Sequence, residues 1–185
     1  MGSLSNIQKQ VILGSILGDG YMRKKTNAHL QITHSYKQKD YVDWKYKILK
    51  NFVSSVPKKY DGNAGRVGYR FFTNSIPELT TFYDIFYQNK EKIIPINLIL
   101  TPLILAVWYM DDGCRSYNAS YLNTQMFNQE SQMNLMNSLR AIGLNSHLNK
   151  DKIYQRIRIT TESTKIFFRM IKKFVIPSMY YKISA

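Results

Sequence analysis

The sequence predicts an α+β fold built from two similar halves, and three observations lead to this prediction. An apolar run that ends in an aspartate and a glycine occurs twice, at residues 12–20 and 105–113. Segments that alternate apolar and polar residues follow each copy, and segments with apolar residues at helical spacing follow those strands. The two copies align without a gap when Asp19 is set against Asp112, so we interpret them as an internal repeat that relates the halves by a pseudo-twofold.

Each copy of the repeat is predicted to be a buried helix. Apolar side chains fill nearly every position for two turns, and the final glycine suits the left-handed residue that often follows a helix. If the two helices pair, Gly14 and Gly18 lie on one face and allow close approach against Ala106. Asp19 and Asp112 then lie together at the helix ends, where two carboxylates repel each other unless cations lie between them. Hard oxygen ligands of this kind suit Mg²⁺. A single aspartate here would ordinarily only open a turn, and the matched duplication argues against that interpretation.

Composition points to a polyanionic partner. The 185 residues have a formal net charge of +14, and an acidic membrane surface is the competing partner. No apolar run approaches the roughly 20 residues that a spanning helix needs, and the positive charges lie among Tyr, Asn, Gln and Thr, so we expect nucleic acid and no membrane. The single cysteine, Cys114, and three scattered histidines exclude a disulfide framework and a cysteine zinc site. Met1-Gly2-Ser3 resembles an added leader, and we expect no secretory or transit segment after it.

The first half is taken as residues 1–97. After the first motif, two strands are expected to form a ribbon, and a helix rich in aromatic residues at core spacing follows and ends at Pro57. Arg66 and Arg70 fall on one face of a later strand by parity. The expected order is a ribbon at 21–27 and 29–35, a helix at 38–56, a basic turn at 58–65, a strand at 66–73, a helix at 76–88 and a linker at 89–95.

The second half, residues 98–185, repeats this order. Its elements are a ribbon at 115–117 and 121–126, a helix at 131–142, a turn at 143–152, a strand at 154–160 and a helix at 163–174. Each half therefore has at least three strands. A fourth strand within 54–60 and 145–150 completes the order α-β-β-α-β-β-α.

Polar side chains along these strands are candidates for reading DNA. Amide, hydroxyl and guanidinium groups on a two-stranded ribbon match the base edges of a major groove, although the alternative for each is an ordinary solvated sheet face. The candidates are Arg23, Lys25, Gln31, Thr33, Arg66, Arg70, Arg115, Tyr117, Asn123, Gln125, Arg156 and Arg158.

The paired motifs resemble those of LAGLIDADG homing endonucleases of the single-chain kind, which have both motifs in one polypeptide. The second half is similar to the yeast mitochondrial intron-encoded type at 100–102, through Asp111-Asp112-Gly113, at 122–125 and at 176–182. Ser15, Leu17, Val107 and Met110 depart from the family's lettering, but both acidic positions are kept. The resemblance implies a pair of central motif helices and two antiparallel sheets that form a basic saddle over DNA.

The resemblance also implies a metal-dependent nuclease. Asp19 and Asp112 would hold Mg²⁺, with Mn²⁺ able to substitute, and Gly18 and Asp111 would each contribute at most a backbone carbonyl. It further matches Lys92 and Lys182 to the basic catalytic members of the two centres. His34 follows the first ribbon where relatives place a water-positioning group, whereas the second half has Met126 or Phe127 there.

Three functions remain open at this point. The first is a site-specific endonuclease that cuts each strand of a duplex once in the presence of Mg²⁺ and leaves staggered ends. The second is a maturase that assists splicing of its host intron RNA, and the third is an inert DNA-binding regulator; both retained carboxylates argue against the third. The Asn, Ile, Lys and Tyr richness fits an A·T-rich coding genome, so we expect an organellar, mitochondrial location, and a monomer that needs no protein partner.

Overall fold

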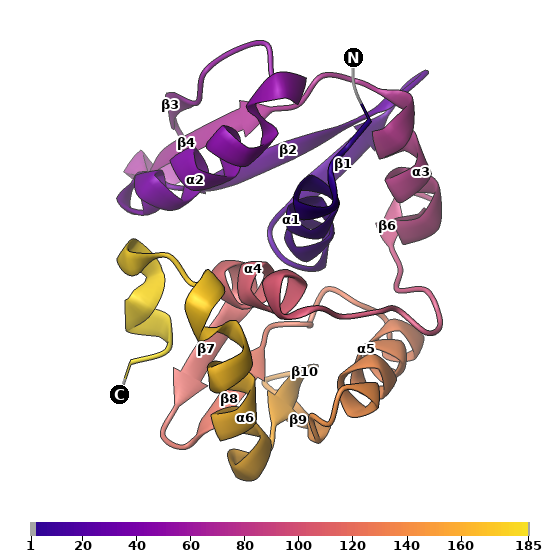
Figure 1. Cartoon of the computed structure of the whole chain (residues 1–185), viewed down its shortest axis with the longest axis vertical. Helices are drawn as coiled ribbons and strands as arrows, with labels where there is room; N and C mark the ends of the chain where they lie inside the picture. Colours follow the sequence, from indigo (N-terminus) through magenta and orange to yellow (C-terminus); the bar gives the residue numbers. More distant parts are fainter. Residues whose placement is uncertain (1–2, 185) are drawn as a thin grey trace. The chain divides into compact units, whose positions relative to one another are not determined.

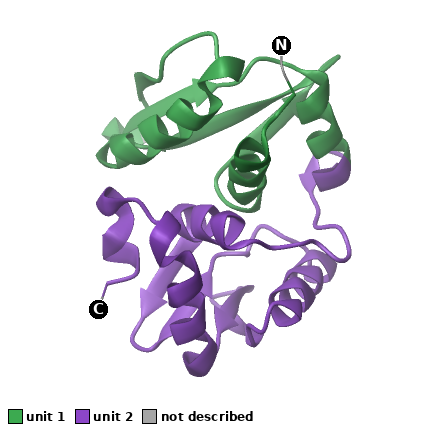
Figure 2. Ribbon diagram, viewed as in Figure 1, with its two compact units in different colours: residues 1–84 green, residues 85–185 purple. Residues whose placement is uncertain are grey.

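The computed structural model describes residues 3–184, so Met1 and Gly2 of the expected leader lie outside it. The chain divides into two compact units between Asp84 and Ile85, inside helix α3 (Pro77–Phe86) (Figure 2). No helix in this range is both long enough and apolar enough to cross a bilayer.

Unit 1 is a four-stranded antiparallel sheet with helices against it (Figure 1). The strand order is β1-β2-β4-β3, and α2 packs across β2 and β4. Its elements, with η for 3-10 helices, are α1 (Asn6–Leu17), β1 (Tyr21–Lys24), β2 (Ala28–Ser35), η1 (Tyr36–Gln38), α2 (Lys39–Leu49), η2 (Lys50–Phe52), β3 (Lys58–Asp61), η3 (Asn63–Gly65), β4 (Val67–Phe72) and most of α3.

Unit 2 has the same sheet order, β7-β8-β10-β9, also antiparallel. Helix α5 packs on β9 and β10, whereas α4 contacts α6, β7 and β8. The elements are β5 (Tyr87–Gln88), β6 (Glu91–Lys92), α4 (Pro102–Asp112), β7 (Gly113–Ser116), β8 (Ala119–Leu122), α5 (Gln129–Ala141), β9 (Ser146–Asp151), β10 (Tyr154–Ile159), α6 (Thr161–Ile171), η4 (Lys172–Phe174) and η5 (Pro177–Lys182).

The two motif helices begin at capping residues. Ser5 and Gln8 form a capping box at the start of α1, each side chain bonding the backbone N–H of the other. The Thr101 hydroxyl accepts from the Ile104 N–H at the start of α4, and Pro102 occupies the first turn, where its missing N–H needs no partner. These caps set where each apolar helix starts, and so which residues reach its far end.

The core of each unit lies on one face of its sheet. Along β2, Ala28, Leu30 and Ile32 are buried, while the residues between them are partly exposed. In unit 2, Leu122 pairs with Ile157, and both are fully buried. The strands alternate because successive side chains point to opposite faces, so the other face of each sheet stays solvated.

The α+β class and the fourth strand of each sheet are confirmed. The turns expected at 58–65 and 143–152 were wrong in part, because β3 and β9 lie within them and pair with β4 and β10. The linker expected at 89–95 contains the second strand of a short hairpin, β5 with β6. Two ribbon strands are shorter than expected, since β1 ends at Lys24 and β8 ends at Leu122. The helix expected at 38–56 is divided into η1, α2 and η2.

The left-handed glycines expected after the motif helices were wrong. Gly113 has φ −78°, and Gly20 has no positive φ either. The lack of space for a side chain explains why glycine occupies these positions. A Cβ on Gly20 would lie 2.6 Å from the Ser15 carbonyl oxygen, and one on Gly113 would lie 2.0 Å from the Tyr109 ring. The chain leaves each helix so close to its last turn that only a glycine fits.

Candidate active site and nucleic-acid interface

The Asp19 carboxylate lies just beyond the last turn of α1. Its side chain is 43% exposed, and its Oδ2 lies 3.3 Å from Nδ1 of the His34 ring, which is almost fully buried. Hydrogen bonds from the Gly18 and Gly20 N–H groups back to the Ser15 carbonyl tighten the chain at this point. Asp19 is therefore held from one side by a core histidine while it remains open to solvent.

A pocket in unit 1 connects Asp19 with the open face of the sheet. Its lining includes Asp19 and His34 together with Thr33, Tyr60 and Arg66. A carboxylate, a hydroxyl and a guanidinium thus border one concave surface. Such a surface offers groups both for a cation and for an anionic backbone.

In unit 2, Asp112 is the last residue of α4 and is partly buried. Its backbone carbonyl accepts from the Asn123 N–H at 3.2 Å. The neighbouring Asp111 is 7% exposed, and its carbonyl accepts from Nζ of Lys182 at 2.9 Å. The structure therefore brings the predicted Lys182 to the end of the second motif helix, from a segment about seventy residues further along the chain.

Tyr109 fixes the segment that carries Lys182. The phenol donates to the Lys182 carbonyl at 3.0 Å, and Lys182 Nζ lies 3.4 Å from the Tyr109 carbonyl. Burial raises the pKa of the Tyr109 phenol, so the hydroxyl stays protonated and remains a donor. Its ring packs edge-on against Phe167 and Phe168 of α6. This packing makes the position of Lys182 a property of the unit 2 core.

Lys92 lies in β6 of the short hairpin, where it pairs with Tyr87 and is partly exposed. The hairpin turns through Asn89 and Lys90, which both have positive φ, of 50° and 68°. The predicted equivalence of Lys92 with Lys182 remains a sequence-based expectation.

The donor sets at the two helix ends suit a hard divalent cation. Each offers carboxylate and backbone carbonyl oxygens, at Asp19 with Gly18 and at Asp112 with Asp111. The C-terminal end of a helix carries partial negative charge, which also favours a cation. In unit 2 the Asp111 carbonyl also accepts from Lys182.

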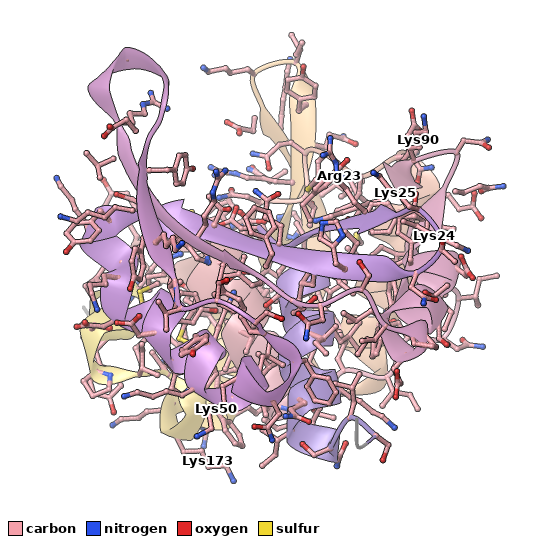
Figure 3. All side chains as sticks on the ribbon, turned by 90° about the horizontal axis from the view of Figure 1, so that it is seen from above. Arg23, Lys24, Lys25, Lys50, Lys90 and Lys173 are labelled. Carbon is pink, nitrogen blue, oxygen red and sulfur yellow. The ribbon has the colours of Figure 1, made fainter. Side chains whose placement is uncertain are left out.

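Most of the unit 1 candidates for DNA contact share the solvated face of the sheet. Strand pairing sets Tyr21 opposite Gln31 and Thr33 opposite Arg70, with Arg23 on the same face. Figure 3 shows Arg23, Lys24 and Lys25 together, and Lys50 apart from them. Lys24 forms an ion pair with Asp84 at 2.6 Å. Lys25 and Arg66 lie just outside the strands and are exposed.

In unit 2, Arg156 and Arg158 lie on the solvated face of β10. The guanidinium of Arg156 lies 4.4 Å from the centre of the Tyr121 ring and donates to the Asn123 amide oxygen at 3.2 Å. Gln125, beyond the end of β8, donates to Asp151 at 2.7 Å. These side chains form a polar layer on the solvated face of the sheet.

Arg115 is not on this layer. It pairs with Ser120, which is buried on the opposite face, and its guanidinium donates to the carbonyls of Tyr117 and Ile183. Tyr117 itself lies in the β7–β8 turn with φ 51° and a 93% exposed side chain. The structure thus separates Arg115 from Arg156 and Arg158, while Tyr117 stays exposed at the sheet's end.

Sequence reasoning missed the polar residues on the fourth strands, because 58–65 and 143–152 lack clear alternation. Lys58 and Tyr60 share a face with Arg70, and Tyr60 lies 4.3 Å below its guanidinium. His147 pairs with Arg158 on β9. The sequence-based prediction also missed Lys45, which is fully buried in α2. The signal was present, since Lys45 falls on the same helical stripe as the apolar core residues of α2.

Comparison with known proteins agrees with this geometry. Residues 9–167 match the LAGLIDADG DNA endonuclease family. A probable intron-encoded endonuclease of Wickerhamomyces canadensis is 31% identical over 198 residues, covering 98% of this chain and 85% of the relative. DNA endonuclease I-ChuI of Chlamydomonas applanata is 30% identical over 210 residues, covering 98% of this chain and 96% of its own.

A solved structure of the homing endonuclease I-WcaI bound to its DNA recognition sequence has a TM-score of 0.92 and 28% sequence identity to this chain. The match covers 100% of this chain and 88% of that one. Family, relatives and solved structure all match over most of the chain, and the family match at 9–167 includes most of α1, all of α4 and both sheets. The chain belongs to the LAGLIDADG DNA endonuclease family.

Proposed function

We propose that this chain is a site-specific homing endonuclease that hydrolyses one phosphodiester in each strand of a long duplex target and leaves staggered ends. The observation that carries the proposal is the repeated arrangement in the two units. Each unit has a motif helix with a carboxylate at its end or just beyond it, and each has a four-stranded sheet with cationic and amide side chains on its solvated face. Two centres in one chain match the two strands of a duplex.

The cation is proposed to bind at the ends of the motif helices. Asp19 and Asp112 would hold Mg²⁺, or Mn²⁺ in its place, with the carbonyls of Gly18 and Asp111 as further oxygen donors. Bound there, the metal supplies a Lewis acid for the attacking and leaving oxygens. The pairing of α1 with α4 that would join these sites remains part of this proposal and rests on the sequence repeat.

The chain's own side chains have separate roles. The His34 ring at 3.3 Å orients the Asp19 carboxylate. Lys182, held at the Asp111 carbonyl, places an ammonium where negative charge develops on the scissile phosphate. Lys92 is proposed to do the same for the other centre, a role that rests on its resemblance to the family pattern.

The solvated sheet faces are proposed to bind the duplex. Gln31 and Thr33 lie on β2, and Arg70 pairs with Thr33 from the neighbouring strand β4. All three side chains can reach base edges in a major groove. Arg156 and Arg158 serve unit 2 in the same way. Exposed residues outside the strands, Lys25 and Arg66, suit the phosphates.

The protein's origin is also part of the proposal. Its relatives include an intron-encoded endonuclease, and the Asn, Ile, Lys and Tyr richness suits an A·T-rich genome, so we propose an organellar, mitochondrial location. The functional halves are proposed as residues 1–97 and 98–185. A single chain that supplies both centres acts as a monomer.

Cleavage of a matched pair of duplexes tests the function. The first duplex joins the two exons that flank the gene's intron, and the second carries the same sequence interrupted by intron. The purified chain should cut both strands of the first duplex with Mg²⁺ or Mn²⁺, and should leave it intact in EDTA. It should not cut the interrupted duplex under any condition.

An RNA arm separates the maturase alternative. The precursor RNA with the same intron is incubated with the chain, and splicing is followed with and without protein. Faster splicing together with an uncut joined-exon duplex would replace the nuclease proposal with the maturase. Binding of the joined-exon duplex without cleavage in any metal would leave a DNA-binding regulator.

A further inference from the structure

Lys45 of α2 is the one fully buried lysine among residues 3–184, with 0% of its surface exposed. Lysine is almost never fully buried without a partner, because its charged form loses its hydration. An aliphatic residue would fill this position in the core with no such loss. A lysine here therefore calls for a function.

The neighbours of Lys45 lead from the core to the candidate active site. Its Nζ lies 3.5 Å from Nε2 of His34 and 4.5 Å from the centre of the Tyr41 ring. The His34 and Tyr41 rings are 5.1 Å apart, so the two aromatic rings and the amine form one cluster. On its other edge, His34 Nδ1 lies 3.3 Å from Asp19 Oδ2. Lys45, His34 and Asp19 thus form a continuous line of contacts, from the buried amine through the imidazole to the carboxylate.

The direction of this line follows from hydrogen-bond chemistry. A lysine ammonium has three donors and no acceptor, so it can only donate to Nε2. A neutral imidazole has one donor and one acceptor nitrogen, so Nε2 as acceptor leaves the proton on Nδ1. That proton then points at the Asp19 carboxylate, which can only accept when ionised.

We propose that Lys45 is a positioning residue for the first nuclease centre, which fixes the tautomer and orientation of His34 and, through it, the Asp19 carboxylate. The inference rests on the proposed role of Asp19 as a metal ligand. Supporting partners of ligating groups typically change activity or metal affinity by about 10–100-fold when they are removed. Lys45 itself lies behind His34 and needs no contact with substrate.

The second unit lacks this line. The buried positions of α2 at Val42, Lys45 and Leu49 recur in α5 at the same spacing as Gln132, Leu135 and Leu139, so Leu135 takes the place of Lys45. The repeat register that sets Leu30 against Leu122 also sets His34 against Met126. Only the first centre should therefore depend on Lys45, and its loss should affect one strand of the duplex.

The test measures each strand separately. The joined-exon duplex carries a different label on each strand, and single-turnover rates are measured at saturating enzyme for the wild type, Lys45→Met and Lys47→Met. Lys47 is exposed on the same helix and serves as the matched control. Lys45→Met should slow one strand by about 10–100-fold, leave the other within about twofold and accumulate nicked product, whereas Lys47→Met should leave both rates unchanged.

The free protein provides a second readout. Long-range proton–nitrogen spectra of the imidazoles, recorded above about pH 8 where an ordinary histidine is neutral, should show His34 with the proton on Nδ1. In Lys45→Met the proton should move toward Nε2. In a His34→Gln background, Lys45→Met should have little further effect on the strand rate, because a glutamine amide has no tautomer to fix.

Three results would overturn the proposal: both strands slowed equally, both rates unchanged, or an unaltered His34 tautomer in Lys45→Met. If Lys45→Met does not fold, Lys45→Leu replaces it, since leucine is the residue that unit 2 has at this position. Asp19→Asn in the same assay separates the two levels of inference. If Asp19→Asn slows a strand and Lys45→Met does not, only the role of Lys45 fails; if Asp19→Asn cuts both strands normally, the proposed role of Asp19 fails.

Discussion

Lys182 and Asp111 are joined by a 2.9 Å hydrogen bond from the lysine Nζ to the aspartate's backbone carbonyl. The bond attaches η5, at the end of the chain, to the end of α4. Tyr109 completes the attachment by donating its phenol to the Lys182 carbonyl. The Lys182 ammonium is thereby held next to the last turn of α4, at the negative end of a buried helix.

Replacing this lysine tests its role in chemistry. Lys182→Met should lower the single-turnover cleavage rate of one strand by roughly 10²–10³, because removal of one donor to a developing negative charge has about that effect. A lysine that touched only a ground-state phosphate would instead weaken binding and reduce the salt slope by about one. Lys92→Met should slow the other strand, and wild-type rates with weakened binding would demote both lysines to positioning contacts.

The motif carboxylates are the second target. Asp19→Asn and Asp112→Asn should each abolish double-strand cleavage and leave specific binding within about tenfold, or 1.4 kcal/mol, because each removes a metal ligand that makes few duplex contacts. Each single variant should keep only the ability to nick one strand, through its intact centre. Gel analysis of supercoiled plasmid distinguishes nicked from linear product, and full cleavage by the double variant would refute the metal assignment.

The glycine after α4 is predicted to be sterically required. Gly113→Ala places a Cβ within 2.0 Å of the Tyr109 ring, which is packed against Phe167 and Phe168. We expect a loss of about 1–3 kcal/mol in the free energy of unfolding, together with slower cleavage through displacement of Lys182. Gly143→Asn is the control, since Gly143 has open space and a left-handed φ of 81° that asparagine tolerates. Equal denaturant midpoints for the two variants would contradict this account.

The two faces of the unit 2 sheet should behave differently. Arg158→Met removes a cation from the solvated face, so DNA affinity should fall and the salt slope should become shallower by about one if Arg158 contacts a phosphate. Arg115→Met removes bonds to the Tyr117 and Ile183 carbonyls, so it should lower thermal stability and leave the salt slope unchanged. Binding isotherms at several salt concentrations and a melting curve of each variant decide the matter, and the reverse pattern would place Arg115 on the duplex.

Binding as a whole should depend strongly on salt. If about ten phosphates are neutralised, log K should fall with log salt with a slope near −9. A slope shallower than about −3 would point away from an extended duplex footprint. The measurement uses the joined-exon duplex in EDTA, so that cleavage does not compete with binding.

The sequence by itself determined the repeat, the helices and the character of the sheets. The apolar runs before Asp19 and Asp112 are long enough to specify buried helices, and their matched spacing indicated two halves. The alternation along β2 placed Gln31 and Thr33 on the solvated face, and strand pairing confirms it. These features could be predicted because they depend on local periodicity, which burial of one face enforces.

Tertiary structure decided what depends on contacts between distant segments. A fourth strand in each half was predicted, but the bounds and partners of β3 and β9 were decided by their pairing with β4 and β10, because their own segments lack clear alternation. Arg115 followed the ribbon's polar pattern, yet its register against Ser120 puts it on the opposite face, since a shift of one residue reverses every side chain. Lys45 lies on the apolar stripe of α2, which the sequence already shows. Its contact with His34 exists only in the folded chain, and the groups that replace the water around a buried amine determine what that amine can do.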